Sequence, residues 1–139
     1  MISQSLIERV KLHEGFRSTP YLDTVGVLTV GYGRNLEAQP FTEQECAAWL
    51  IRELEDIAEE QLPTYGLLEL DNKIRREVLV EMQFNLGETG LQRFRKMFLA
   101  LAAKDFDTAA AEMLDSKWAR QVGQRAVTLA NLMRAGKRD

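Results

Sequence analysis

Three polar residues near the start of the chain have side chains suited to acid–base chemistry. Glu14 stands at the end of a helical pattern, Asp23 opens a turn that contains a glycine, and Thr29 lies in the alternating segment that follows. Hydrolysis of a glycosidic bond needs one carboxylic acid that holds its proton and one carboxylate that has lost it. The sequence therefore offers a candidate acid, a candidate base and a hydroxyl group in one short stretch.

Glu14 continues an apolar stripe on the first helix. Ile2, Leu6 and Val10 precede it at intervals of four residues, so the four side chains share one face. We expect this face to turn toward the core or a cleft, where loss of solvent and the negative end of the helix dipole both favour a protonated acid. The alternative is a solvated glutamate just before the terminating Gly15.

Asp23 and Thr29 each have a simpler explanation as structural residues. Aspartate is common in turns because its side chain bonds the backbone two residues on, and threonine is common in strands. Gly31 and Gly33 would let a ligand approach the backbone closely. Since only about eight residues separate Glu14 from Asp23, the ribbon is expected to fold back near the helix end.

Capping signals and periodicity predict the elements that carry these residues. A first helix is expected from about Ser3 to Glu14, with Ser5 and Glu8 as a capping box and Gly15 as its stop. The alternation of apolar and polar residues between about 16 and 36 is typical of strands.

A long helix is expected from Thr42 to Leu62, with Thr42 and Glu45 as a capping box and Pro63 as its end. The rest of the chain is predicted to be helical, with breaks at Gly87 and a cap at Asp105 or Asp107. The last helix should run from about 123 to 135 and stop at Gly136. The expected fold class is therefore α+β and mainly α.

Length and composition fit one globular domain. The chain has 139 residues, of which 45% are hydrophobic and 28% are charged, which excludes a disordered protein. No run of about 18 apolar residues predicts a membrane span, and the charged N-terminus does not resemble a signal peptide. Cys46 is the only cysteine, so no internal disulfide is possible and a reducing compartment is expected. We find no metal-ligand spacing.

The net charge of −3 hides an asymmetry between the two halves. Residues 1–71 carry a net charge of −8 and residues 72–139 a net charge of +5. A basic half could meet an anionic polymer, although two solvated faces of opposite sign explain the asymmetry equally well. Because the basic residues are not densely clustered with aromatic residues, no nucleic-acid binding is expected.

The run E-G-(x7)-D-(x5)-T-x-G-x-G that begins at Glu14 closely resembles the phage lysozymes of the T-even type, glycoside hydrolase family 24. The segment "RREVLVEMQFNLGETGLQRF" from Arg75 resembles the family's R-R…F-x-x-G-E-T-G segment. The segment "WARQVGQRA" from Trp118 is similar to its W-(x6)-R-A segment. The three segments occur in the family's order and cover essentially the whole chain.

The resemblance implies a two-lobed lysozyme-like fold in a single domain, 1–139. Residues 1–14 and 63–139 would form the larger helical lobe, residues 15–36 a small antiparallel β lobe, and residues 42–62 a helix that joins them. The segment between Gly33 and Thr42 is shorter than in the best-known members, and Arg34 stands where that type has a histidine. A trimmed β lobe with altered subsites is therefore expected.

The resemblance also implies a muramidase that needs no cofactor. Its substrate would be bacterial peptidoglycan, cleaved at the β-1,4 bond between N-acetylmuramic acid and N-acetylglucosamine. By family analogy Glu14 protonates the glycosidic oxygen, Asp23 activates or electrostatically assists water, and Thr29 helps to position that water. The family is regarded as inverting, so the two carboxyl groups are expected to lie about 6.5–9.5 Å apart.

Seven further positions are expected to contact substrate: Gly31, Gly33, Phe84, Asn85, Glu88, Thr89 and Arg125. The segment from Phe84 to Gly90 should lie on the opposite wall of the cleft, with helix termination at Gly87 as the local alternative. Arg125 is expected beside Glu14, where its positive charge favours an ionised carboxylate and opposes the effect of burial. A solvated helix arginine is the alternative.

As an endolysin the protein would be a monomer without stable membrane association. It would accumulate in the host bacterial cytoplasm and reach the wall only after a holin-like pore opens. Two alternatives remain open. One is a non-catalytic glycan-binding or virion-assembly protein that has kept the fold. The other is a lytic transglycosylase, which forms anhydro sugars and needs an acid but no water-activating aspartate.

Overall fold

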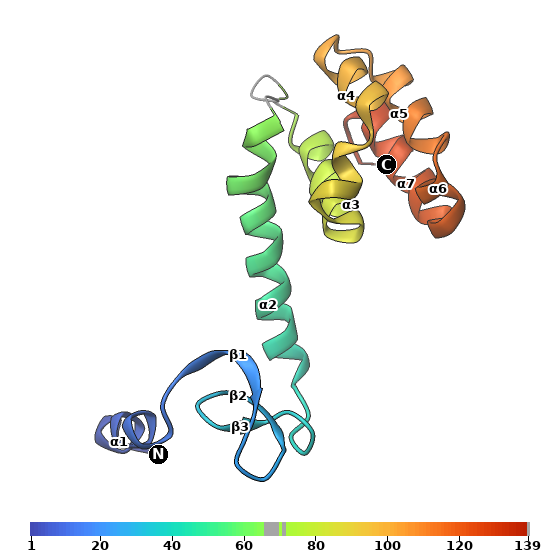
Figure 1. Cartoon of the computed structure of the whole chain (residues 1–139). Coiled ribbons are helices and arrows are strands. Elements are labelled where there is room, and N and C mark those ends of the chain that lie inside the picture. Colours follow the sequence, from blue (N-terminus) through green and yellow to red (C-terminus); the bar gives the residue numbers. More distant parts are fainter. Residues whose placement is uncertain (66–69, 71, 139) are drawn as a thin grey trace. The chain divides into compact units, whose positions relative to one another are not determined.

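The computed structural model describes residues 1–65, 70 and 72–138, and the chain divides into two compact units. The N-terminal unit is Met1–Cys46 and the C-terminal unit is Ala47–Asp139. Helices make up most of the described residues, and a small antiparallel sheet lies in the N-terminal unit (Figure 1). The predicted fold class, α+β and mainly α, is therefore confirmed. The expected domain and lobe boundaries stay predictions.

The first helix, α1, spans Gln4–Glu14. Ser3 is its N-cap, because the Ser3 hydroxyl accepts a hydrogen bond from the Leu6 amide at 3.2 Å. The predicted capping box of Ser5 and Glu8 is wrong, since the helix begins before Ser5. Gly15 ends the helix as predicted, with φ of 73° and its amide bonded to the Lys11 carbonyl at 2.9 Å.

The sheet follows directly and has the order β1-β2-β3. Its strands are β1 (Arg17–Leu22), β2 (Leu28–Gly31) and β3 (Arg34–Asn35), which lie within the predicted β segment. A turn joins β1 to β2, in which the Gly26 amide donates to the Asp23 carbonyl at 3.0 Å. Gly26 has φ of 85°, a conformation that favours glycine.

The long helix α2 spans Glu43–Asp56 and begins with the predicted capping box. The Glu45 amide donates to the Thr42 hydroxyl, and the Thr42 amide donates to the Glu45 carboxylate, each at 3.1 Å. The bonds from the Thr42 amide and hydroxyl lower the pKa of Glu45, because they stabilise its ionised form. The local sequence therefore specifies this helix start without help from distant residues.

The predicted end of this helix at Pro63 is wrong. The chain continues from α2 through a π-helical turn, η1 (Ile57–Gln61), into a 3₁₀ turn, η2 (Leu62–Tyr65). Proline is tolerated there because the first turn of a helical segment does not require its missing amide hydrogen. Ile57 and Leu62 are buried in the core of the C-terminal unit.

The remaining helices build the C-terminal unit. They are α3 (Lys73–Gln92), α4 (Arg95–Ala102), α5 (Phe106–Leu114), α6 (Lys117–Val122) and α7 (Gln124–Ala135). α5 packs against both α4 and α7, and α3 packs against α7 (Figure 1). Met82, Met97, Met113 and Met133 are fully buried at the centre of this packing. Methionine suits such a core because its flexible side chain fills irregular gaps.

Two glycines set helix boundaries in the C-terminal unit. Gly87 has φ of 78° and breaks α3 where the sequence predicted a break. Gly136 is in the left-handed conformation and ends α7, also as predicted. The expected last helix included residue 123, but the structure gives Gly123 φ of 60° and separates α6 from α7 there. The short helix α6 was not predicted.

The start of α3 is bound to the end of α7. Asn72 caps α3 through the Arg75 amide at 2.9 Å and donates to the Gly136 carbonyl at 2.9 Å. Arg75 donates to the carbonyls of Met133 and Arg134 at 2.7 and 2.9 Å. A cation at the C-terminal carbonyls also suits the helix dipole. The first arginine of the "RREVLV" segment therefore has a structural role in joining these two helices.

Asp105 caps α5 and gives a prediction for stability against pH. Its carboxylate accepts from the hydroxyl and the amide of Thr108 at 2.6 and 3.1 Å, and these bonds lower the pKa of Asp105. The carboxylate therefore contributes stability above its ordinary pKa of about 3.9, and that contribution is lost as the pH falls through the lowered folded pKa.

We expect Asp105→Asn to have a lower Tm than wild type at pH 7, because asparagine keeps the acceptor oxygen but not its charge. This difference should disappear as the pH falls below the lowered folded pKa of Asp105. Thermal melts of both proteins across this pH range are the measurement. A Tm difference that persists unchanged in acid would show that the charge of Asp105 does not stabilise the cap.

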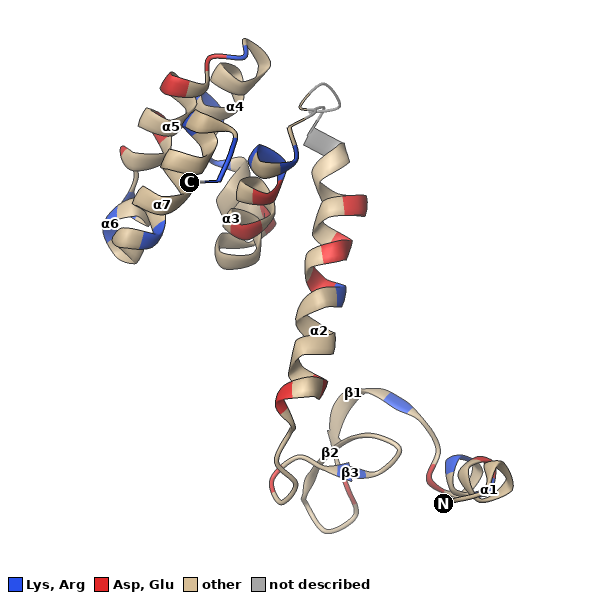
Figure 2. Ribbon diagram, turned by 180° about the vertical axis from the view of Figure 1, so that it is seen from behind, with Lys and Arg blue, Asp and Glu red and all other residues tan. Residues whose placement is uncertain are grey.

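Charge is distributed unevenly along the helices. Figure 2 colours acidic residues red along α2 and basic residues blue on α6 and at the start of α3. Among the described residues, no helix combines the length and the apolar character needed to cross a membrane.

Candidate functional site

Glu14 is the last residue of α1, and its carboxylate lies against the backbone of Gly33. A Cβ atom built on Gly33 would stand 2.8 Å from Glu14 Oε2, which is closer than side-chain carbons approach. Gly33 also has φ of 79°, so glycine suits this position both for space and for backbone conformation. The carboxyl group predicted as an acid and one of the two predicted glycines are therefore neighbours.

Within the N-terminal unit the Glu14 face of α1 is not buried. No residue of α1 is buried, and Ile2 and Val10 are 70% and 45% exposed. Glu14 is exposed as well. A unit of this size has little interior, because small bodies bury a small fraction of their surface. The periodicity located the face on which Glu14 lies, but not the solvent exposure of that face.

Asp23 organises the turn between β1 and β2. Its Oδ1 atom accepts from the amides of Val25 and Val27 at 2.9 and 2.8 Å. Asp23 therefore has the predicted role of a turn residue, and this role uses one of its two carboxylate oxygens. Within the described residues the other oxygen, Oδ2, has no hydrogen-bond partner. The turn consequently holds Asp23 in place while one carboxylate oxygen stays available to a ligand or water.

Thr29 is joined to Asp23 through Val27. Thr29 is only 4% exposed, and its hydroxyl donates to the Val27 carbonyl at 2.9 Å. The Asp23 amide donates to the same carbonyl at 2.9 Å. Because the Thr29 hydroxyl uses its hydrogen in this bond, its oxygen is left as an acceptor. A water molecule bound there would be held by one of its hydrogens.

The register of the sheet brings the glycine segment back toward the helix end. Thr29 on β2 pairs with Tyr21 on β1, and Gly31 pairs with Arg17, three residues after Glu14. The register shifts between these two pairs, which marks an irregularity in β1. The N-terminal unit thus places Glu14 with Gly33 and Asp23 with Thr29.

The predicted substrate contacts on α3 lie in the C-terminal unit. Phe84 is 43% exposed, and Asn85 follows it on the helix. Asn85 Oδ1 accepts from the indole nitrogen of Trp118 at 2.7 Å. Because an indole N–H can only donate, this bond fixes the amide so that the Asn85 nitrogen points away as a donor. Trp118 was recognised as part of a sequence segment but not as the residue that orients Asn85.

Glu88 and Thr89 follow the break at Gly87 and are both exposed. Glu88 Oε1 is 3.5 Å from Gln92 Nε2, a long contact that leaves the carboxylate largely free of local bonds. Helix termination, the alternative offered by the sequence, is therefore seen at Gly87. It does not compete with a binding role, because residues at helix breaks often carry ligand contacts.

Arg125 at the start of α7 pairs with Glu81 on α3. Arg125 Nε donates to Glu81 Oε2 at 2.9 Å, and both side chains are partly exposed. Glu81 precedes Asn85 by four residues, so the two lie on one face of α3. This spacing was the signal in the sequence that could have identified Glu81. The placement of Arg125 beside Glu14 stays a prediction.

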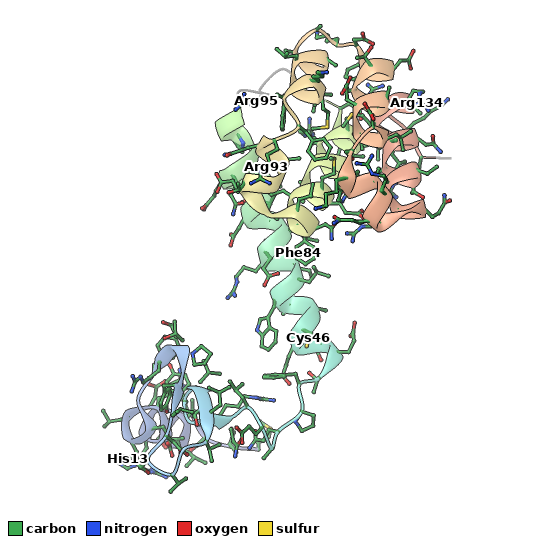
Figure 3. The ribbon with its side chains drawn as sticks, turned by 45° about the vertical axis from the view of Figure 1, so that its right-hand side comes forward. His13, Cys46, Phe84, Arg93, Arg95 and Arg134 are labelled. Atoms are coloured by element: carbon green, nitrogen blue, oxygen red, sulfur yellow. The ribbon has the colours of Figure 1, made fainter. Side chains whose placement is uncertain are left out.

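His13 and Cys46 are both exposed, and Figure 3 labels them in the N-terminal unit. Among the described residues, no group of three or more histidine, cysteine, aspartate or glutamate side chains could hold a metal ion.

Comparison with known families adds to this geometry. The family model described as phage lysozyme matches residues 11–137. This range includes all the predicted site residues, those of the N-terminal unit and those of the C-terminal unit. The chain belongs to the phage lysozyme family.

Two relatives of the phage lysozyme chain illustrate its similarity to known proteins. It is 24% identical over 163 residues to the pre-baseplate central spike protein Gp5 of Enterobacteria phage T4, an alignment that covers 96% of this chain and 28% of that protein. It is 36% identical over 78 residues to the SAR-endolysin of Bacteriophage PS119, covering 53% of this chain and 46% of that protein. The chain thus spans less than half the length of each relative.

The contact between Glu14 and Gly33 gives a prediction for this member of the phage lysozyme family. We expect Gly33→Ala to reduce activity by about tenfold or more, because the new methyl group would displace the Glu14 carboxylate. Gly26→Ala is the matched control, since Gly26 also has positive φ but nothing lies within 4 Å of an added Cβ. Both variants should lose about 1–2 kcal/mol of stability from backbone strain, and only Gly33→Ala should lose activity. Equal activity of the two variants would contradict the role assigned to this contact.

Proposed function

We propose that this phage lysozyme family member is a peptidoglycan hydrolase of the T-even type, glycoside hydrolase family 24. It would act as a muramidase on the β-1,4 bond between N-acetylmuramic acid and N-acetylglucosamine. The observation that carries the proposal is the arrangement in the N-terminal unit. There Glu14 lies against Gly33, while Asp23 and Thr29 share the Val27 carbonyl.

In the proposed reaction Glu14 donates its proton to the glycosidic oxygen as the bond from that oxygen to the anomeric carbon breaks. Water attacks the anomeric carbon from the opposite face, and Asp23 takes up the proton that the water loses. The Thr29 oxygen accepts one hydrogen of this water and so orients it. The configuration at the anomeric carbon is inverted, which requires a separation of about 6.5–9.5 Å between the two carboxyl groups.

We propose that the substrate contacts backbone atoms in the N-terminal unit and side chains in the C-terminal unit. Gly31 and Gly33 leave the backbone open to a sugar ring. The other proposed contacts are Phe84, Asn85, Glu88, Thr89 and Arg125. Among them, Asn85 offers a donor whose direction is fixed by Trp118, which suits a carbonyl or hydroxyl oxygen of the glycan or its peptide.

The biological setting that we propose is host cell lysis. The protein would act without a cofactor, as a monomer, and it would bind neither nucleic acid nor membranes stably. It would collect in the bacterial cytoplasm and reach the wall through a holin-dependent opening. The name of the relative from Bacteriophage PS119, a SAR-endolysin, supports the part of this proposal that concerns host cell lysis.

A role in the virus particle is a second candidate, because nearly the whole chain aligns with a central spike protein. A virion enzyme would have the same chemistry and a different location. A virion protein that only binds glycan would need neither a proton donor nor a water-activating carboxylate. Detection of this chain in purified particles by mass spectrometry would favour the virion role over lysis from within.

The test of the proposed function is a turbidity assay on purified peptidoglycan with mass spectrometry of the fragments. We expect clearing and fragments with a reducing N-acetylmuramic acid end. Anhydro-muropeptides would instead identify a lytic transglycosylase, and unchanged peptidoglycan would identify a non-catalytic binder. NMR of the first product should detect the α-anomer, and an initial β-anomer would rule out the inverting mechanism.

A further inference from the structure

The C-terminal unit contains a cavity of about 670 Å³, and none of the residues proposed to contact substrate lines it. It lies where α3 passes into α4 and where α5 passes into α6. Figure 3 labels Arg93 and Arg95 at the first of these junctions. Its volume exceeds that of a water molecule or a single small ion many times and falls in the range of small-molecule sites.

Positive side chains dominate the lining of this cavity. The cations are Arg93, Arg95, Lys96 and Lys117, and the lining acids are Glu112 and Asp115. Within the described residues none of the four cations forms an ion pair, whereas Arg125 and Arg134 pair with Glu81 and Asp107. The four cations exceed the two lining acids, so the cavity carries a net positive charge.

The apolar part of the lining is rigid. Trp118 is 4% exposed, and its indole nitrogen is bonded to Asn85. Phe94 packs edge-to-face on Trp118 with ring centroids 6.0 Å apart, and Met97 is fully buried beside them. Because packing and a hydrogen bond hold these side chains, a ligand would find the cavity already formed.

Two of the cations occupy positions that are unfavourable for the helix itself. Arg95 and Lys96 lie in the first turn of α4, which contains no acidic residue, and Phe94 provides no side-chain cap. The positive end of a helix dipole favours anions over cations. Local stability therefore does not explain these two residues, whereas an anionic ligand between them and Arg93 would.

We propose that this cavity binds a ligand that carries two or more anionic oxygen groups, either carboxylates or phosphates. Guanidinium groups such as those of Arg93 and Arg95 bond both kinds of group in a bidentate manner. The breadth of the cavity and its four cations suit several spaced negative charges better than one. The aromatic wall of Phe94 and Trp118 would contact the part of the ligand that joins its charged groups.

The experiment titrates the full chain, labelled with ¹⁵N, with pyrophosphate and separately with citrate. We expect shifts of the Trp118 indole resonance and of the amides around residues 93–97 and 112–118. The variant R93Q/R95Q/K96Q should bind the effective probe about tenfold more weakly or worse, since charge-assisted bonds are lost. The control K104Q/K137Q/R138Q removes the same number of charges from outside the cavity and should change affinity by less than about threefold.

Thermal melts separate a binding role from a structural one. The Tm of R93Q/R95Q/K96Q should not fall, because two of the removed cations oppose the dipole of α4. Shifts with pyrophosphate alone would assign a phosphate ligand, and shifts with citrate alone a carboxylate ligand. The absence of shifts with both probes, or equal weakening in the two variants, would overturn the proposal. Neither outcome bears on hydrolysis, which is tested on peptidoglycan.

Discussion

Turnover of peptidoglycan is expected to fall by a factor between about 10² and 10⁴ when Glu14 is replaced by glutamine. Glutamine has the shape of glutamate but cannot give a proton to the glycosidic oxygen. Among the residues of the N-terminal unit the Glu14 carboxylate makes no hydrogen bond or ion pair, and the side chain is exposed there. The fold therefore does not depend on it, and Tm should change by no more than a surface substitution allows.

Glu8→Gln is the matched control for this experiment. Glu8 is also exposed, lies on the same helix and forms local contacts with Gln4 and Lys11 at 2.7 and 3.9 Å. We expect it to keep wild-type activity. Initial rates in the turbidity assay, taken together with thermal melts, give the comparison. If Glu14→Gln kept more than about a tenth of wild-type activity, Glu14 would not be the general acid.

Features fixed by neighbouring residues were predictable from the sequence. The capping box of Thr42 and Glu45, the cap at Asp105 and the stops at Gly15 and Gly136 all formed as expected. In each case the chemistry acts over three or four residues, so no knowledge of distant parts is needed. The correct positions of these caps explain why the order of the elements was largely right.

Errors arose where several local solutions were similar in energy or where the outcome depended on distant residues. Ser3 and Ser5 are both suitable N-cap residues, and the local sequence does not show which of them begins the helix. The continuation through Pro63 into a 3₁₀ turn depends on Ile57 and Leu62 finding places in the core. Tertiary packing decides where such a helix ends, and the periodicity of the sequence alone gives no information on that packing.

The same contrast between local contacts and contacts of distant residues applies to the candidate site. The turn made by Asp23 was predictable because its partners, Val25 and Val27, are close in sequence. The ion pair of Arg125 with Glu81 was missed, because Glu81 lies 44 residues away on another helix and only its spacing from Asn85 pointed to it. Sequence reasoning therefore predicted the hydrogen bonds between sequence neighbours and missed the ion pair between distant residues.

Replacement of Asp23 is expected to cause the second large loss of activity. Another turn in the same unit shows how the charge of Asp23 can be separated from its role in the turn. Asn35 Oδ1 accepts from the amides of Glu37 and Ala38 at 2.9 and 3.0 Å, much as Asp23 accepts from two amides of its own turn. An asparagine therefore suffices for this backbone role. The turn therefore does not require the negative charge of Asp23, and this charge is free for the proposed activation of water.

We expect Asp23→Asn to lower turnover about 10²-fold or more while its Tm stays close to that of wild type. Asp23→Ala should lose the same activity and, in addition, about 0.5–1.5 kcal/mol for each of the two lost hydrogen bonds. Asn35→Ala is the control, which should lose comparable stability but keep its activity at temperatures well below its Tm. Rates on purified peptidoglycan and denaturant melts of the three variants provide the test. An active Asp23→Asn enzyme would reduce Asp23 to a turn residue, because the one property that this substitution removes is the charge that must draw a proton from the attacking water.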